Sequence, residues 1–373
     1  MSAADQSAVS AARPAAGRRP VPPHIPSLDG LRAVSFMIVF VAHAGVHTFP
    51  GGFGVTVFFF LSGFLITTLM RMEREATGTV NLPHFYLRRV LRILPPFYLV
   101  LLFAISLTLL GILPGPLKPP PLIAQSLHFF NYWHIWKGGD GAPMGTVPYW
   151  SLAVEEHFYL LFPMLYLAAS RRLARPAQAK AFWALCALIC AWRCFLVFVI
   201  GVPEDRTYMA SDTRFDSIFF GCALAIGANP VLDRPRIAEP WWKWVIVPAA
   251  LALLTFTFLY RTPWFRETIR YSLQGIALTP IFISAVRYPG WLPYRILNLK
   301  PVAFFGVLSY VLYLVHQVVL FSLGFQIPNV HGAVRAVLGL ALSVLIAVIV
   351  HYAVEKPSQN LRKRLTRRKP VAA

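Results

Sequence analysis

The chain has 373 residues, of which 57% are hydrophobic and only 13% are charged, and its formal net charge is +20. Soluble domains carry about 25% charged residues, so the composition excludes an ordinary soluble domain. The positive charge is also typical of nucleic-acid-binding proteins. However, Lys and Arg collect in the cytoplasmic loops of membrane proteins, so no nucleic-acid partner is expected if the basic residues fall on one side.

Ten apolar blocks follow one another along the chain, and nearly all have the length needed to cross about 30 Å of hydrocarbon as a helix. A further apolar stretch, residues 121–136, is short and contains several polar residues. When this stretch is placed in an outer loop (113–149), most of the 35 Lys and Arg residues share a side with both termini, as the positive-inside rule requires. The sequence therefore predicts an all-α, polytopic transmembrane bundle of about ten spanning helices with both termini cytoplasmic. The predicted spans are residues 31–48, 53–70, 93–112, 150–170, 181–200, 214–229, 243–260, 270–287, 302–325 and 336–353.

Both ends of the chain are basic. Residues 1–26 are rich in Ala, Pro and Arg and lack the apolar core of a signal peptide, so we expect a disordered cytoplasmic tail. Residues 27–357 then form the transmembrane domain, and residues 358–373 form a second basic cytoplasmic tail. The four cysteines lie in apolar stretches, where thiolate metal ligands would be costly. We expect small buried hydrophobic residues, with no disulfide and no metal site, at Cys186, Cys190, Cys194 and Cys222.

The first span carries two ionisable residues three helical turns apart. Arg32 and His43 project along one face of a helix, about 16 Å from each other. This spacing puts Arg32 near the cytoplasmic surface and His43 deep in the bilayer, where an ionisable residue is a functional hypothesis by default. A histidine that only hydrogen-bonds a neighbouring helix is the structural alternative. Ser27 or Asp29 is the candidate cap of this helix.

The next polar features precede or enter later spans. Arg88, Arg89 and Arg92 anchor the cytoplasmic end of the third span, and planar guanidinium groups also match phosphate oxygens, which favours a site for a phosphorylated donor. Ser62-Gly63 permits close helix packing. Each remaining polar residue is either a contact between helices or part of a site: Glu155, Glu156, Asp212, Arg214, Asp216, Ser309, Tyr313, His316 and Glu355.

Together these segments resemble the acyltransferase-3 family, the membrane O-acetylases that decorate bacterial surface glycans. One departure is Thr56, which stands where family members often carry an acidic residue, so no carboxylate role is expected there. The matching blocks run in family order over residues 27–357: Leu28–Ala33 (LDGLRA) with His43, Phe58–Leu65 (FFFLSGFL), Arg88–Pro95 (RRVLRILP), Trp150–Glu156 (WSLAVEE), Arg214–Asp216 (RFD), Ser309–His316 (SYVLYLVH) and Glu355–Pro357 (EKP).

The resemblance implies transfer of an acyl group, usually acetyl, from a cytoplasmic acyl-CoA to a hydroxyl of a surface glycan or lipid-linked sugar. It implies His43 as general base, Arg32 as a group that positions the donor or stabilises the oxyanion, and Glu155 as an orienting group. The expected site is in the bacterial cytoplasmic (inner) membrane and holds no metal and no tightly bound cofactor. The expected donor-binding residues are Arg88, Arg89 and Arg92, and the expected substrate-binding residues are Asp29, Ser62, Trp150, Arg214, Asp216 and His316.

Three alternatives remain open at this stage. A close variant acylates a small secondary metabolite such as a macrolide. A proton-coupled transporter or flippase would use His43 for proton coupling, but it forms no new ester and needs no coenzyme A. A non-catalytic scaffold gives no reason for Arg32 and His43 to share a helix face. The sequence leaves the acceptor, the acyl chain length and the oligomeric state undetermined.

Overall fold

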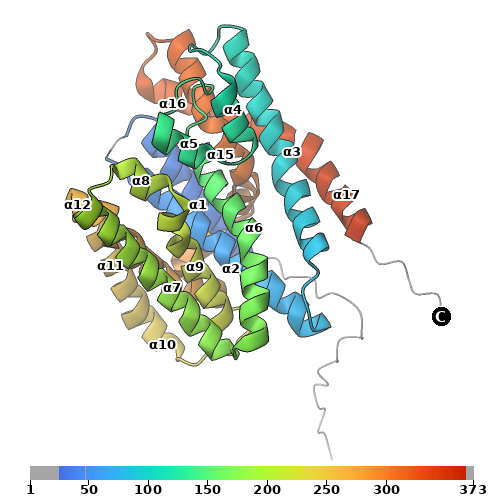
Figure 1. Cartoon of the computed structure of the whole chain (residues 1–373), viewed down its shortest axis with the longest axis vertical. Coiled ribbons are helices and arrows are strands. Elements are labelled where there is room, and N and C mark those ends of the chain that lie inside the picture. Colours follow the sequence, from blue (N-terminus) through green and yellow to red (C-terminus); the bar gives the residue numbers. More distant parts are fainter. Residues whose placement is uncertain (1–24, 47, 367–373) are drawn as a thin grey trace, which may run out of the picture.

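The computed structural model describes residues 25–46 and 48–366, and within these ranges every regular element is a helix (Figure 1). The predicted all-α class is therefore confirmed. The predicted tail at residues 1–26 falls almost wholly outside the described residues, as do residues 367–373 of the second tail.

The helices cover the chain with short connections, and segments labelled η are single π-helical turns. Figure 1 shows α7, α10 and α11 on one side of the bundle and α3 and α17 on the other. In chain order the elements are α1 (Pro26–His43), α2 (Gly51–Thr77), α3 (Leu82–Leu109), α4 (Pro119–Ser126), α5 (Phe130–Lys137), α6 (Tyr149–Arg172), α7 (Arg175–Phe195), η1 (Leu196–Ile200), α8 (Glu204–Met209), α9 (Ser211–Gly227), α10 (Glu239–Trp241), η2 (Trp242–Ile246), α11 (Val247–Leu259), α12 (Pro263–Glu267), α13 (Ile269–Arg287), α14 (Leu292–Leu297), α15 (Lys300–Gln326), α16 (Gly332–Val350), η3 (His351–Glu355) and α17 (Lys356–Thr366).

In the described part of the chain, eight helical segments are long and apolar enough to cross a membrane. They coincide with eight of the ten predicted spans. The other two, 31–48 and 214–229, fall on α1 and α9, which have 18 and 17 residues. Most of α9 is buried among other helices, and a helix that faces protein on all sides needs no lipid-facing apolar surface. The count of ten and the cytoplasmic termini stay predictions.

The stretch 121–136 is not a span. It folds as α4 and α5, two helices of 8 residues each, and a helix of that length is about 12 Å long. The chain changes direction between them at His128, whose φ is 52°. Buried amides fix both helices to the bundle, because Gln125 donates to Thr146 Oγ1 and Asn131 donates to the carbonyl oxygen of Met209.

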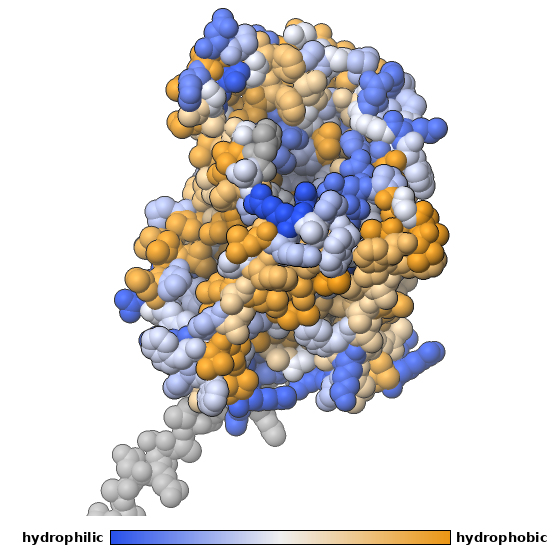
Figure 2. Space-filling model, turned by 90° about the vertical axis from the view of Figure 1, so that its left-hand side faces the viewer, coloured by the Kyte–Doolittle hydropathy of each residue, from blue (hydrophilic) through white to orange (hydrophobic). Residues whose placement is uncertain are grey.

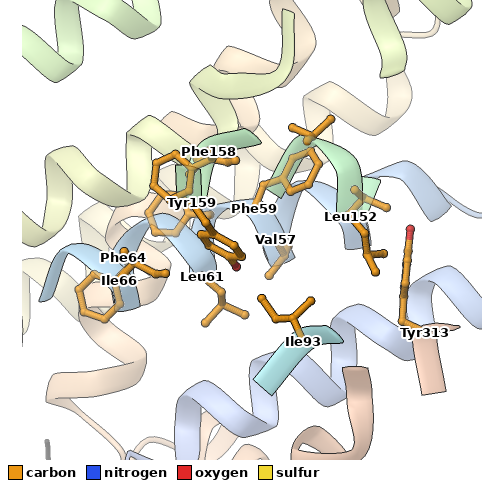
Figure 3. Packing of buried hydrophobic residues seen from close by; sticks show 14 of the residues in the cluster. Val57, Phe59, Leu61, Phe64, Ile66, Ile93, Leu152, Phe158, Tyr159 and Tyr313 are labelled. Atoms are coloured by element: carbon orange, nitrogen blue, oxygen red, sulfur yellow. The ribbon is translucent and has the colours of Figure 1, made fainter. Parts of the chain in front are cut away.

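Close backbone contacts hold the centre of the bundle together. A Cβ added at Gly63 of α2 would lie 2.0 Å from the carbonyl oxygen of Ile218 in α9, and one at Gly221 would lie 2.1 Å from that of Phe60. Only glycine fits such a contact, so the predicted packing role of the Ser62-Gly63 step is supported. Around this contact, aromatic and aliphatic side chains of α2, α3, α6 and α15 face one another (Figure 3).

The start of α1 is built differently from the prediction. Neither Ser27 nor Asp29 caps the helix: the N-cap residue is Ile25, which makes no side-chain cap. Ser27 Oγ instead donates to Asn298 Oδ1 at 2.9 Å. Both polar residues are buried because α1 packs against α14 and α15, so a tertiary contact takes the hydroxyl that a cap would use.

The outer surface is consistent with a lipid environment. Figure 2 shows apolar residues over much of one face, with hydrophilic residues gathered around a hollow in its upper third. Large apolar side chains such as Leu109 and Leu259 are about three-quarters exposed, at 75% and 76%. Exposure of this kind is expected where the solvent is lipid rather than water.

Candidate active site

A cavity of about 420 Å³ lies between α1, α2, α3, α6, α15 and α17. Its size is that of a small-molecule or cofactor site. It gathers residues from segments that are far apart in the sequence. Six of the twelve predicted site residues line it: Asp29, Arg32, Ser62, Arg89, Arg92 and Glu155.

The inner part of the cavity holds a small polar network. Ser62 Oγ donates to Glu155 Oε1 at 2.7 Å, and the hydroxyl of Tyr159 donates to Glu155 Oε2 and Ser62 Oγ, both at 3.2 Å. Tyr159 was missed at the sequence level, although it stands four residues after Glu155 and so shares its helix face. The network gives the carboxyl group a fixed orientation between α2 and α6.

Arginines line the end of the cavity next to this network. Arg32 donates to Asp29 Oδ1 at 2.7 Å. The guanidinium of Arg89 lies 5.7 Å from the ring centroid of Tyr159, and its buried Nε has no hydrogen-bond partner. For Arg92, the described residues provide neither a hydrogen bond nor an ion pair at contact distance. This end of the cavity therefore has donor capacity for an anionic ligand.

Arg88, the third predicted donor-binding arginine, lies outside the cavity. Its Nη2 pairs with Glu73 Oε2 at 3.0 Å, and Glu73 also accepts from the backbone N–H of Asn81. The pair therefore fastens the connection between α2 and α3. Arg88 faces away from its neighbour Arg89 because adjacent residues of a helix point about 100° apart.

His43 and His316 also lie outside the cavity, but they contact each other. His43 Nδ1 is 2.8 Å from His316 Nε2, and the two rings stack with centroids 5.1 Å apart. His316 is fully buried, whereas His43 is exposed at the end of α1. The structure thus joins the first and the ninth predicted spans through these two rings.

The hydrogen-bond network determines the tautomer of each ring. His316 Nδ1 lies 2.9 Å from the carbonyl oxygen of Tyr313 and 3.1 Å from that of Leu312. Carbonyl oxygens only accept, so His316 Nδ1 carries the hydrogen and, in the neutral ring, Nε2 accepts. His43 Nδ1 must then be the donor, which leaves the lone pair of His43 on Nε2.

Tyr313 connects the histidine pair to the cavity. It lines the cavity, its hydroxyl is 2.8 Å from Ser151 Oγ, and its ring centroid is 5.7 Å from that of His316. Figure 3 shows Tyr313 turned toward α2, as are Ile93 of α3 and Leu152 of α6. The cavity wall is therefore one aromatic residue away from His316.

Comparison of the sequence with known proteins assigns the chain to one family. The profile of the acyltransferase-3 family, described as an acyltransferase domain, matches residues 25–352. The chain belongs to the acyltransferase-3 family. It is 29% identical, over 90% of its length, to the peptidoglycan O-acetyltransferase OatA of Listeria monocytogenes, and 27% identical, over 90% of its length, to the O-acetyltransferase OatA of Staphylococcus aureus. The chain spans just over half the length of these curated relatives, 56% and 57%. No solved structure matches it.

Family membership confirms the predicted enzyme class, an acyltransferase, and gives no support to the transporter and scaffold alternatives.

In this acyltransferase-3 chain, the departure at Thr56 has a structural counterpart. Arg214 is fully buried, and its Nη2 donates to Thr56 Oγ1 at 3.1 Å. Its guanidinium lies 4.0 Å from the ring centroid of Tyr271 and 5.8 Å from that of Trp150. Within the described ranges, no carboxylate is at ion-pair distance from Arg214. Aromatic faces and a hydroxyl stabilise this cation.

Asp216, predicted to bind substrate, is fully buried and pairs with Arg193. Arg193 Nη2 donates to Asp216 Oδ2 at 2.6 Å, and Ser272 Oγ donates to the same oxygen at 2.8 Å. The backbone N–H of Ser217 donates to Asp216 Oδ1. The acyltransferase-3 block at Arg214–Asp216 therefore lies in the protein interior, outside the cavity, with Asp216 engaged by neighbouring protein groups.

Proposed function

We propose that this protein is a membrane O-acyltransferase that moves an acyl group, acetyl in the simplest case, from a cytoplasmic acyl-CoA to a hydroxyl of a surface glycan or lipid-linked sugar. One observation carries the proposal: Tyr313 lines a cavity that arginines also line, and its ring packs against His316 of the His316–His43 pair. The names of the relatives, O-acetyltransferases and in one case a peptidoglycan O-acetyltransferase, support acetyl as the group and a glycan as the acceptor.

The two ends of the cavity suit the two parts of such a donor. Guanidinium groups form bidentate hydrogen bonds with phosphate oxygens, so Arg89 and Arg92 are assigned to the phosphates. The thioester then points toward Tyr313. Arg32 and His43 are about 16 Å apart along α1, which is too far for both to act on one carbonyl group. Arg32 was expected either to position the donor or to stabilise the oxyanion, and we therefore assign it the first of these roles.

The reaction uses His43 as general base. His43 Nε2 takes the proton of the acceptor hydroxyl, whose oxygen attacks the thioester carbonyl carbon. The tetrahedral intermediate collapses with cleavage of the C–S bond, the acyl ester forms, and the coenzyme A thiolate takes up the proton. His316 acts through His43: by accepting from Nδ1–H, it keeps the lone pair on Nε2. General base catalysis of this kind contributes about 10²–10⁴-fold in rate.

The test is transfer of labelled acetyl from acetyl-CoA to membrane material, with wild-type protein and His43→Ala at equal protein levels. We expect an alkali-labile ester with the wild type and a loss of about 10²–10⁴-fold in the variant. Equal transfer by both proteins would show that His43 is not the base. If wild-type protein transfers no label from acetyl-CoA, the proposed donor is wrong. A label that reaches a soluble metabolite but no glycan would favour the small-molecule acceptor.

A further inference from the structure

The cavity has a wall that lies beyond the part of the chain matched by the acyltransferase family. The family match ends at residue 352. Three later residues nevertheless line the cavity: Glu355, Gln359 and Arg362. Glu355 ends η3, inside the predicted transmembrane domain. Gln359 and Arg362 belong to α17, in the part of the chain that the sequence pattern assigned to a basic tail.

The last helical segment is long enough to extend past the membrane. It runs without interruption from Gly332 to Leu365, which is 34 residues, or about 51 Å. The hydrocarbon core is only about 30 Å thick. Its basic end, α17, therefore projects from the hydrocarbon and lies along α3, the helix that carries Arg89 and Arg92 (Figure 1).

A π-helical turn directs one face of α17 toward the cavity. In this turn, η3, the backbone N–H of Lys356 donates to the carbonyl oxygen of His351. His351 Nδ1 also lies 2.6 Å from Glu355 Oε2. A π turn adds one residue to the helix and so rotates the following face by about 100°. Gln359 and Arg362 stand three residues apart on that rotated face, and both reach the cavity.

The charges at this end of the cavity are predominantly positive. Arg362 lies close enough to Arg92 and Arg88 for like-charge repulsion, and Arg92 repels Arg89 in the same way. Four carboxyl groups lie near them. Asp29 pairs with Arg32, and Glu355 contacts His351. Glu155 attracts Arg92 and Glu156 attracts Arg89, in both cases without an ion pair at contact distance. Packing cationic groups together costs free energy, and an anion bound between them offsets that cost.

We propose that α17 completes the phosphate end of the donor site and that Arg362 binds a phosphate of the acyl-CoA, opposite Arg89 and Arg92. The proposal rests on the proposed function in one respect, since it takes the donor to be an acyl-CoA. A guanidinium fork on α17 and others on α3 then hold the phosphates between two helices. Closure of the cavity over the donor depends on a segment outside the matched family domain.

The experiment compares two donors with the full-length protein. Acetyl-CoA carries the phosphates, whereas S-acetylpantetheine carries the same thioester without them. We expect Arg362→Gln to lower kcat/KM for acetyl-CoA about 10- to 100-fold, mainly through KM, as loss of a charge-assisted hydrogen bond predicts. The same variant should leave kcat/KM for S-acetylpantetheine unchanged. Arg364→Gln is the matched control, because Arg364 is exposed on the same helix and does not line the cavity.

Three outcomes would overturn the proposal. An unchanged kcat/KM for acetyl-CoA in Arg362→Gln would show that Arg362 does not bind the donor. Equal losses for both donors would indicate a folding defect, or a role in binding lipid headgroups, rather than contact with the donor's phosphates. Equal losses in Arg362→Gln and Arg364→Gln would indicate only general attraction by the basic helix.

Direct binding of coenzyme A, measured by calorimetry on the purified protein, separates this proposal from the proposed function. If wild-type protein binds coenzyme A without transferring acetyl, and Arg362→Gln weakens that binding, the phosphate site stands and the proposed reaction fails. If wild-type protein does not bind coenzyme A, the phosphate site is refuted.

Discussion

Replacing Asp216 with asparagine tests whether this residue supports the fold or binds substrate. The substitution keeps the shape of the side chain and removes its charge. Arg193 would then remain buried with three neutral acceptors, namely Ser272 Oγ and the carbonyl oxygens of Thr213 and Thr268. The geometry therefore predicts that Asp216→Asn leaves a buried and uncompensated guanidinium.

The expected magnitude follows from that geometry. Both side chains of the Arg193–Asp216 pair have zero exposure, and the N–O distance is 2.6 Å. Breaking a buried ion pair by removing one partner costs about 3–5 kcal/mol. A double variant, Arg193→Met with Asp216→Leu, removes both charges. It should be less destabilised than the sum of the two single variants, by about 1–3 kcal/mol.

The assay is thermal unfolding in a mild detergent, followed by the fluorescence of the ten tryptophans, together with the KM for the acceptor. A fall in Tm for Asp216→Asn, with partial recovery in the double variant, is the expected result. The interpretation fails if Asp216→Asn unfolds at the wild-type Tm while the KM for the acceptor rises. That outcome would restore the substrate-binding role suggested by the family resemblance.

Three further predictions concern the base, the packing and an ion pair at the membrane surface. His316→Asn should lower kcat about 10²-fold, because His43 loses its fixed orientation, and should also shift the pH–rate profile, which a purely structural defect would not. Gly63→Ala should lower the Tm of the detergent-solubilised protein by overpacking that costs about 1–3 kcal/mol. Burial tends to raise the pKa of Asp233, but hydrogen bonds from Arg71 outweigh it and hold that pKa below its usual range. The Arg71–Asp233 pair therefore stabilises the fold at pH values above the unfolded carboxyl pKa of about 3.9. This stabilisation is lost as the pH falls through the lower pKa of the folded state. The difference in Tm between wild type and Asp233→Asn should therefore narrow on acidification.

The sequence predicted those features of the fold that depend on hydropathy, namely the apolar helices. Eight predicted spans coincide with apolar helices, because lipid exposure requires apolar residues over a fixed length. The predicted span 31–48 begins five residues after the start of α1 (Pro26–His43), since the first turn of α1 is polar. That turn is buried by α15, where a Cβ on Gly306 would lie 1.8 Å from the carbonyl oxygen of Asp29. Contacts of this kind, and the π-helical turns, depend on tertiary packing that a hydropathy pattern does not contain.

The structure separates the predicted site residues into those that line the cavity and those that lie outside it. Arg89 and Arg92 are three residues apart and so share a helix face, and both line the cavity. Arg32 and His43 were predicted to form one site, but only Arg32 reaches the cavity. The contact that orients His43 comes from His316, which is 273 residues away in the sequence. No helical spacing predicts such a pairing.

Some arginines are balanced by protein groups and others face the cavity, and the sequence alone does not distinguish the two kinds. The positive-inside rule accounts for which side of the membrane they occupy, and it treats all arginines alike. In the structure, Arg193 pairs with a carboxylate and Arg214 is enclosed by aromatic rings, so both charges are balanced inside the fold. Arg89 and Arg92 face a cavity, and within residues 25–46 and 48–366 no carboxylate pairs with either. A cation balanced by the protein stabilises the fold, whereas a cation left facing a cavity is available to a ligand. The difference between the two kinds is therefore set by tertiary contacts, and it supports the proposal that the arginines of the cavity bind the donor.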